Sequence, residues 1–157
     1  KWIIVGKYVP QNKPLWSGFV WRSELMTGLY ENFLVLFCIN ILTGTPFIKY
    51  PLRLLGSKIG KRTCIFTTQI TEFDLIHVDD YAALNDNCTM QTHLFEDRVM
   101  KMSYVTLEEN CSVGGMSVVL YDSKMEKNAI LDPLSVLMKN ETLSADNRYI
   151  GAPANKI

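Results

Sequence analysis

"LEENCSVGGMSVVLYDSKMEKNAILDPLSVLMKNET", residues 107–142, divides into six consecutive units of six residues. The first position of each unit is a large apolar residue, in the order Leu, Val, Val, Met, Leu and Leu. The fifth position is small in every unit except the last. Upstream, "VDDYAA" (78–83), "LNDNCT" (84–89) and "MQTHLF" (90–95) keep the same register, with a large apolar residue at the first position. A period of six matches neither an amphipathic strand nor an α-helix.

This period predicts a parallel β-helix of triangular cross-section, in which each unit forms one side and one corner and about 18 residues complete a coil. The large residue points inward, and the small residue fits the crowded corner. Four units have asparagine at the fourth position, which suits a tight corner because asparagine tolerates the left-handed backbone region. These are Asn87, Asn110, Asn128 and Asn140. We expect about five coils with seven buried inward residues: Leu84, Leu107, Val113, Val119, Met125, Leu131 and Leu137.

The repeat restarts upstream at "IGKRTC" (59–64) and "IFTTQI" (65–70), so we assign residues 56–157 to the β-helix and 1–55 to a separate helical or irregular N-terminal segment. The most apolar stretch of that segment is residues 29–48, whose uninterrupted part, Phe33 to Ile39, is shorter than the roughly 20 residues that cross a bilayer. Two interpretations follow. One is a buried helix that ends near 43–46, and the other is a helix lying against a membrane or against neighbouring membrane helices.

Composition excludes several classes of function. Sixteen basic residues balance sixteen acidic ones, so the chain has no net charge to attract nucleic acid. The four cysteines form no CxxC pair and no Cys/His cluster, so we expect no metal site. The chain begins with the strand-like sequence "KWIIVGKYV", which indicates a piece of a longer protein.

The units resemble those of the hexapeptide-repeat acyltransferases, whose fold is a left-handed parallel β-helix. Residues 109–119 and 127–157 are similar to the closing coils of the maltose and galactoside acetyltransferases, including the terminal glycine-x-proline-alanine signature at Gly151, Pro153 and Ala154. This resemblance covers roughly residues 56–157. It implies a trimeric acyltransferase that uses acetyl coenzyme A.

A second resemblance covers nearly the whole chain. "PLWSGFVWRSEL" (14–25), "TGTPF" (43–47), "LRLLGSKIG" (52–60), "TEFDLI" (71–76) and "QTHLFEDRVMKMS" (91–103) resemble the terminal region of membrane-associated non-ribosomal peptide synthetases of the poly-lysine synthetase type. The resemblance implies a location at the cytoplasmic face of the membrane and peptide-bond formation from a donor on the phosphopantetheine arm of a carrier domain. Its implied partners are adenylation and carrier domains, neighbouring membrane helices, and other copies of the β-helix domain or a homotrimer.

His93 is the candidate general base. The spacing from Met90 to Leu107 exceeds two repeat units by five residues, which predicts a loop at 96–100 just after this histidine. "QTHLF" resembles the threonine-x-x-histidine-proline segment of the acetyltransferases, whose histidine is the base, with Leu94 in place of the proline. An imidazole with a pKa near neutrality can take a proton from an attacking amine or hydroxyl. His77 has no comparable motif and is expected to be structural.

A carboxylate should orient the imidazole of His93. An unbroken register places Asp74 one coil away from it, and coils are spaced about 4.8 Å apart. We therefore assign Asp74 to this role. Glu72, or Glu96 or Asp97 folding back from the loop, are the alternatives.

Four further residues are candidates for binding the substrate or the pantetheine arm. Arg98 could bind a carboxylate or a phosphate, or pair with Glu96 within the loop. Gly114 and Gly115 could form only a tight corner, or could offer a backbone amide that polarises the thioester carbonyl, as the resemblance to the acetyltransferases implies.

Three functions follow from these residues. The first is an acyl-transfer domain of a synthetase that joins a carrier-bound aminoacyl thioester to an amine. The second is a trimeric acetyltransferase that uses acetyl coenzyme A, and the third is a non-catalytic solenoid that scaffolds its neighbours. The basic residues of the late coils are interleaved with acidic ones, so we expect weak binding of free acetyl coenzyme A.

Overall fold

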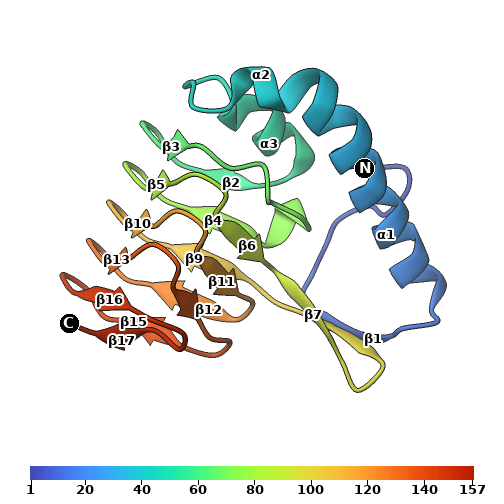
Figure 1. Cartoon of the computed structure of the whole chain (residues 1–157). Coiled ribbons are helices and arrows are strands. Elements are labelled where there is room, and N and C mark those ends of the chain that lie inside the picture. Colours follow the sequence, from blue (N-terminus) through green and yellow to red (C-terminus); the bar gives the residue numbers. More distant parts are fainter.

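The computed structural model describes all 157 residues and is mainly β, with helices in the N-terminal third. Three parallel sheets stand around the inward-facing side chains, and the chain passes from one sheet to the next in turn (Figure 1). The first sheet contains β2 (Lys58–Ile59), β4 (Ile76–Val78), β9 (Val105–Leu107), β12 (Ser123–Met125) and β15 (Thr142–Leu143). The second contains β3 (Cys64–Ile65), β5 (Ala83–Leu84), β10 (Ser112–Val113), β13 (Ile130–Leu131) and β16 (Arg148–Ile150), with β17 (Asn155–Lys156) antiparallel at its edge. The third contains β6 (Thr89–Gln91), β11 (Val118–Leu120) and β14 (Val136–Leu137).

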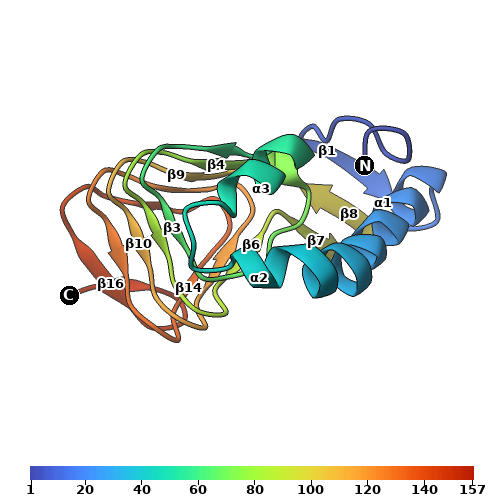
Figure 2. The ribbon, with the colours of Figure 1, turned by 90° about the horizontal axis from the view of Figure 1, so that it is seen from above.

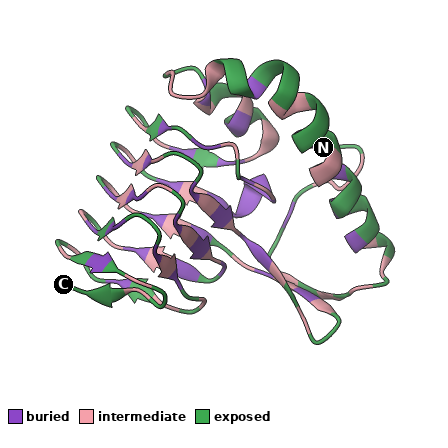
Figure 3. Ribbon diagram, in the orientation of Figure 1, coloured by how far each residue is buried: buried purple, intermediate pink, exposed green.

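The six-residue period sets the register of the later coils. Val113 pairs with Leu131, and Val119 pairs with Leu137, so neighbouring strands are separated by three repeat units. All seven predicted inward residues are 0% exposed, which confirms the predicted core (Figure 3). The four asparagines have φ between 52° and 61°, as expected at tight corners.

The N-terminal segment contains one long, mostly exposed helix, which contradicts the interpretation of a buried helix. α1 (Gly18–Leu29) continues through a π-helix (Tyr30–Ile39) into α2 (Asn40–Leu42). By length and composition only, Gly18–Leu42 could cross a membrane, because it has 25 residues and its most apolar window has a mean hydropathy of 1.6. Only 17% of that window is buried. Asn32 lies inside this helix, where its side-chain amide donates to the carbonyl of Gly28.

The helices and the coils share one hydrophobic core. α3 (Lys49–Leu55) lies over the first coil beside α2, as Figures 1 and 2 show. Its Leu52, together with Met26, Tyr30 and Ile39 of the long helix, belongs to the same buried cluster as the inward residues of the coils. Residue 55 therefore marks a change of architecture within one core.

A hairpin leaves the coils where a loop at 96–100 was expected. β7 (His93–Glu96) and β8 (Val99–Met102) are antiparallel, and β1 (Gln11–Pro14) adds to the outer side of β8. The turn consists of Asp97 and Arg98, both with positive φ. Two such residues match the twist of the flanking strands, which is why the extra residues form an ordered hairpin instead of an irregular loop.

Candidate active site

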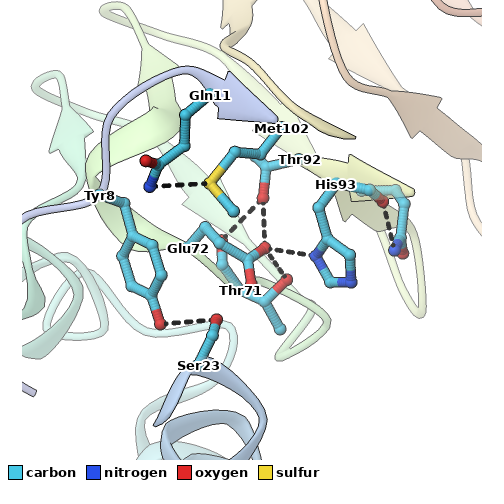
Figure 4. Close-up of polar contacts among 9 residues, drawn as sticks. Tyr8, Gln11, Ser23, Thr71, Glu72, Thr92, His93 and Met102 are labelled. Atoms are coloured by element: carbon cyan, nitrogen blue, oxygen red, sulfur yellow. Dashed lines mark hydrogen bonds and ion pairs between the residues drawn. The ribbon is translucent and has the colours of Figure 1, made fainter. Parts of the chain in front are cut away.

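A buried carboxylate and the candidate base meet where the hairpin leaves the coils. Glu72 precedes a short 3-10 turn (Phe73–Leu75), and His93 is the first residue of β7. Oε2 of Glu72 lies 2.7 Å from Nδ1 of His93 (Figure 4). The backbone of Glu72 has φ 41° and ψ 56°, in the left-handed region. Twelve other non-glycine residues of this chain also have positive φ, mostly at corners and turns, so this conformation marks a sharp turn at Glu72.

Three donors converge on the same carboxylate oxygen. Besides Nδ1 of His93, the hydroxyls of Thr92 and Thr71 donate to Oε2 of Glu72 at 2.7 and 2.8 Å. The side chain of Glu72 is fully buried, and that of His93 is 11% exposed. Buried polar groups hold one arrangement when they are bonded in this way. The imidazole is therefore fixed in orientation by a carboxylate that is itself fixed.

The electrostatics keep both groups ready for proton transfer. Burial alone would lower the pKa of His93, but the hydrogen bond to Glu72 and its charge, with a smaller contribution from Glu24, raise that pKa above its ordinary value. Burial would raise the pKa of Glu72, but the hydrogen bonds from His93, Thr92 and Thr71 hold that pKa below its usual range. Glu72 is thus ionised near neutral pH and stabilises a proton on the imidazole.

The second ring nitrogen of His93 is available to a substrate. Because Nδ1 donates to the carboxylate, the neutral ring carries its lone pair on Nε2. His93 lines a pocket of about 280 Å³. A ring held by a carboxylate at one nitrogen and open at the other is the arrangement of a general base.

One wall of this pocket is acidic and comes from the long helix. Glu24, Thr27 and Glu31 face Gln69, Thr71, Thr89, Met90 and Gln91 across it. Burial raises the pKa of Glu24, the charge of His93 lowers it, and the charges of Glu72 and Glu31 raise it again, with a net increase. An acidic wall beside a base suits an acceptor that carries a positive charge.

Asp74 does not orient His93, contrary to the prediction from register. Its Oδ2 accepts from Nζ of Lys1 at 2.5 Å and from the backbone N–H of Tyr8 at 2.8 Å. The prediction assumed an unbroken coil of three repeat units, but the pairing of Ile70 with Met90 shows that this coil is longer. The two additional residues place Glu72, which was the alternative, beside the histidine.

Glu96 and Arg98 lie on the hairpin, away from the His93 pocket. Glu96 accepts from Lys101 at 3.0 Å and also bonds to Lys139. Arg98 is exposed at the turn and does not pair with Glu96, which instead forms an ion pair with Lys101. Neither residue lines the pocket of His93.

Gly114 and Gly115 form a tight corner after β10, whereas His93 follows β6 of the third sheet at a different corner. The amide of Gly114 donates to the carbonyl of Leu131 at 2.7 Å, so it is not free for a substrate. A Cβ on Gly114 would lie 2.3 Å from the backbone nitrogen of Pro133, which explains the glycine by close packing between coils. Within one chain, these glycines do not meet the histidine.

The contribution of the long helix was not predicted from the sequence. Glu24, Thr27 and Glu31 are spaced by three and four residues and therefore share one face of a helix. This polar stripe in an otherwise apolar segment is the signal that could have indicated that the helix lines a polar pocket.

Comparison with known proteins supports a synthetase origin. No family model matches the chain. A delta-poly-L-ornithine synthetase of Acinetobacter baumannii is 42% identical over 154 residues, which are 98% of this chain and 12% of that protein. This chain is a homologue of that synthetase segment. The predicted kinship with a poly-amino-acid synthetase is confirmed, and the chain spans about one eighth of the length of the relative that it matches.

Solved structures are similar to this chain in fold. A maltose O-acetyltransferase from Clostridium difficile 630 matches with a TM-score of 0.57 at 18% identity, covering 85% of this chain and 87% of that one. A hexapeptide-repeat-containing acetyltransferase from Vibrio cholerae also gives a TM-score of 0.57, at 14% identity, covering 70% and 77%. At such identities the likeness concerns the fold. The segment has the architecture of the hexapeptide-repeat acetyltransferases.

Proposed function

We propose that this chain is an acyl-transfer domain of a larger synthetase and joins a carrier-bound aminoacyl thioester to an amine. The observation that carries the proposal is the Glu72–His93 pair: Nδ1 bonds to the carboxylate, and His93 lines a pocket with an acidic wall. The homology to a poly-ornithine synthetase supports a cationic amine as the acceptor. The hexapeptide-repeat architecture supports acyl transfer. We also propose that the coils of this β-helix wind in the left-handed sense.

The reaction balances with the groups of this site. The amine nitrogen forms a bond to the thioester carbonyl carbon, and Nε2 of His93 takes the proton that this nitrogen loses. The carbon–sulfur bond then breaks, and the leaving thiolate recovers the proton from the imidazolium. Glu72 stabilises the imidazolium between these steps through its bond to Nδ1. A general base of this kind contributes roughly 10²- to 10⁴-fold to the rate.

A donor on the phosphopantetheine arm of a carrier domain is favoured over free coenzyme A. Of the five basic residues after residue 103, all but Lys156 are already in ion pairs: Lys124–Glu108, Lys127–Glu109, Lys139–Glu96 and Arg148–Asp132. They leave no concentration of free cations for the adenine phosphates of coenzyme A. A tethered donor needs less, because contact between domains supplies the positioning. We propose that carrier and adenylation domains lie elsewhere in the same synthetase, at the cytoplasmic face of the membrane.

The second candidate is an acetyltransferase that uses acetyl coenzyme A as a trimer. It is favoured by the Vibrio cholerae acetyltransferase, whose structure in complex with acetyl coenzyme A matches this fold with a TM-score of 0.57. In a trimer, the corner at Gly114 and Gly115 of one copy would lie against the hairpin of a neighbouring copy.

The test uses the intact synthetase with His93 replaced by alanine or by glutamine. Both variants should fold, with far-ultraviolet circular dichroism like that of the wild type, while amide formation from the aminoacylated carrier falls by about 10²- to 10⁴-fold. Glutamine keeps the polarity but cannot act as a base near pH 7. Full turnover by either variant would refute the role of His93. Transfer from acetyl coenzyme A, with none from the carrier, would favour the second candidate.

A further inference from the structure

The charge balance of the chain conceals two oppositely charged halves. Residues 1–62 contain nine Lys or Arg and two Asp or Glu, for a net charge of +7. Residues 63–157 contain seven Lys or Arg and fourteen Asp or Glu, for a net charge of −7. Such asymmetry indicates that the first part faces an anionic partner.

A second pocket, separate from the pocket of His93, is lined by residues of both parts and takes its lysines and its arginine from the basic one. It has a volume of about 320 Å³ and is lined by Lys7 of the N-terminal segment, Arg53 of α3, Lys58 of β2 and His77 of β4. A shallower hollow of about 300 Å³ shares Arg53 and Lys58 with it. The four residues come from four elements, so the pocket is assembled by the fold and not by one run of basic sequence.

The cations of this pocket lack anionic partners within the chain. Lys7 and Lys58 are exposed and take part in none of the ion pairs, which contrasts with the paired lysines of the late coils. Arg53 donates from Nε and Nη2 to the backbone carbonyls of Ile59 and Gly60, with Nε 2.7 Å from the oxygen of Ile59. The carboxylate of Asp74, which also lines the pocket, is held by Lys1. The lining is therefore positively charged overall.

His77 adds an unsatisfied polar atom to the same pocket. Its Nε2 is buried and has no hydrogen-bond partner. The ring packs against Tyr104, with centroids 4.9 Å apart, and His77 stands beside Lys58 in the register of β4 and β2. A buried polar atom without a partner is costly and calls for an explanation. A phosphate oxygen held by Lys7 and Lys58 would provide the missing partner after a small rotation of the His77 ring, because Nε2 has almost no accessible surface in the present arrangement.

We propose that this pocket binds a phosphate group, held by the ammonium groups of Lys7 and Lys58 and by Nε2–H of His77. A phosphate ester presents several charged or polar oxygens and can engage three donors at once, which the two oxygens of a carboxylate do less well. The group could belong to a lipid headgroup or to a soluble phosphate ester. The inference does not depend on the acyl-transfer function.

The first experiment follows the imidazole signals of His77 by NMR during titration with inorganic phosphate. The titration is repeated on the Lys7→Gln/Lys58→Gln double variant and on a control, Lys13→Gln/Lys156→Gln, which also removes two lysines. Phosphate should shift the His77 signals in the wild type and in the control, and its apparent affinity should fall at least 10-fold in the Lys7/Lys58 variant. Equal responses in all three proteins, or no response at His77, would overturn the proposal.

A second experiment identifies the source of the phosphate. Sedimentation is measured with phosphatidylglycerol and with phosphatidylcholine vesicles, and glycerol 3-phosphate is titrated separately. Binding to phosphatidylglycerol vesicles that the Lys7/Lys58 variant weakens supports a lipid headgroup. Binding of glycerol 3-phosphate without vesicle binding supports a soluble ester. Failure of both probes, or binding of either that is insensitive to the variant, would reject the site.

Discussion

Ile70 pairs with Met90 across a coil that is longer than the regular one, in which Val113 pairs with Leu131. The two extra residues of this coil lie next to the left-handed turn at Glu72. Because these two residues shift the register, Glu72 lies beside Thr92 and His93 and accepts hydrogen bonds from both. An irregularity in one coil thus positions the carboxylate of the proposed catalytic pair.

Replacing Glu72 with glutamine should change the pH dependence of acyl transfer. The carboxylate raises the pKa of His93, and a base must be deprotonated to act, so the wild-type rate should rise with pH through this raised pKa. In Glu72→Gln the rise should move to lower pH, and the plateau should fall by about 10- to 10⁴-fold because the imidazolium loses its stabilising charge. Rates measured between pH 5 and 9 with the intact synthetase test this.

Asp74→Asn is the matched control for that experiment. It removes a carboxylate that is almost as buried as Glu72, but one that bonds to Lys1 and Tyr8. Its pH–rate profile should keep the wild-type midpoint. A shifted midpoint in Asp74→Asn, with an unchanged one in Glu72→Gln, would restore the assignment based on an unbroken register.

Neutralising the acidic wall should weaken acceptor binding. Glu24→Gln/Glu31→Gln removes two charges that face His93 across the pocket. For a diamine acceptor at low salt, KM should rise by about 10-fold, since the two exposed charges together contribute on the order of 1.4 kcal/mol, while kcat changes little. An acceptor with a single amine, which is neutral when it reacts and has no second ammonium group, should show a much smaller change. Glu109→Gln, on the coils and away from the pocket, is the control, and an equal effect of both replacements would argue against an acidic acceptor site.

The β-helix should collapse when a charge enters its interior. Val119 is 0% exposed, whereas Val118 beside it in β11 faces outward and is half-buried. An unpaired buried carboxylate costs several kcal/mol, so Val119→Asp should yield unfolded or aggregated protein. Val118→Asp should fold with a slightly lower melting temperature. Thermal unfolding followed by circular dichroism checks both, and a stable Val119→Asp protein would contradict the inward register.

Free acetyl coenzyme A should bind weakly. The late coils offer ion-paired lysines and no free basic cluster, so calorimetry on the wild-type chain should detect little heat at micromolar ligand. The aminoacylated carrier domain should serve as donor under the same conditions. Tight binding of acetyl coenzyme A, with acetylation of a small amine, would establish the acetyltransferase alternative.

The regular coils could be predicted from the sequence because each inward residue recurs at a fixed interval. Val119 and Leu137 needed only this period to be placed in one stack. Glu72 could not be assigned, because its position depends on a local slip that the period itself does not contain. Glu24 lies far before Glu72 in the chain, in a helix outside the repeat, and its approach to His93 depends on how that helix packs. The full length of the Gly18–Leu42 helix could not be predicted from the apolar Phe33–Ile39 stretch, because a helix continues wherever backbone bonds are satisfied and not only where side chains are apolar.

The antiparallel pairing of β1 with β8, from Gln11 opposite Met102 to Pro14 opposite Val99, has a consequence for engineering. The segment that ends with β1 holds the hairpin that begins at His93, and the following helix supplies the wall opposite it. A chimera joined at residue 55 would combine the histidine of one parent with the β1 strand and the acidic pocket wall of another. The smallest piece that can be exchanged between synthetases is therefore the whole length from the N-terminal strand to the last coil.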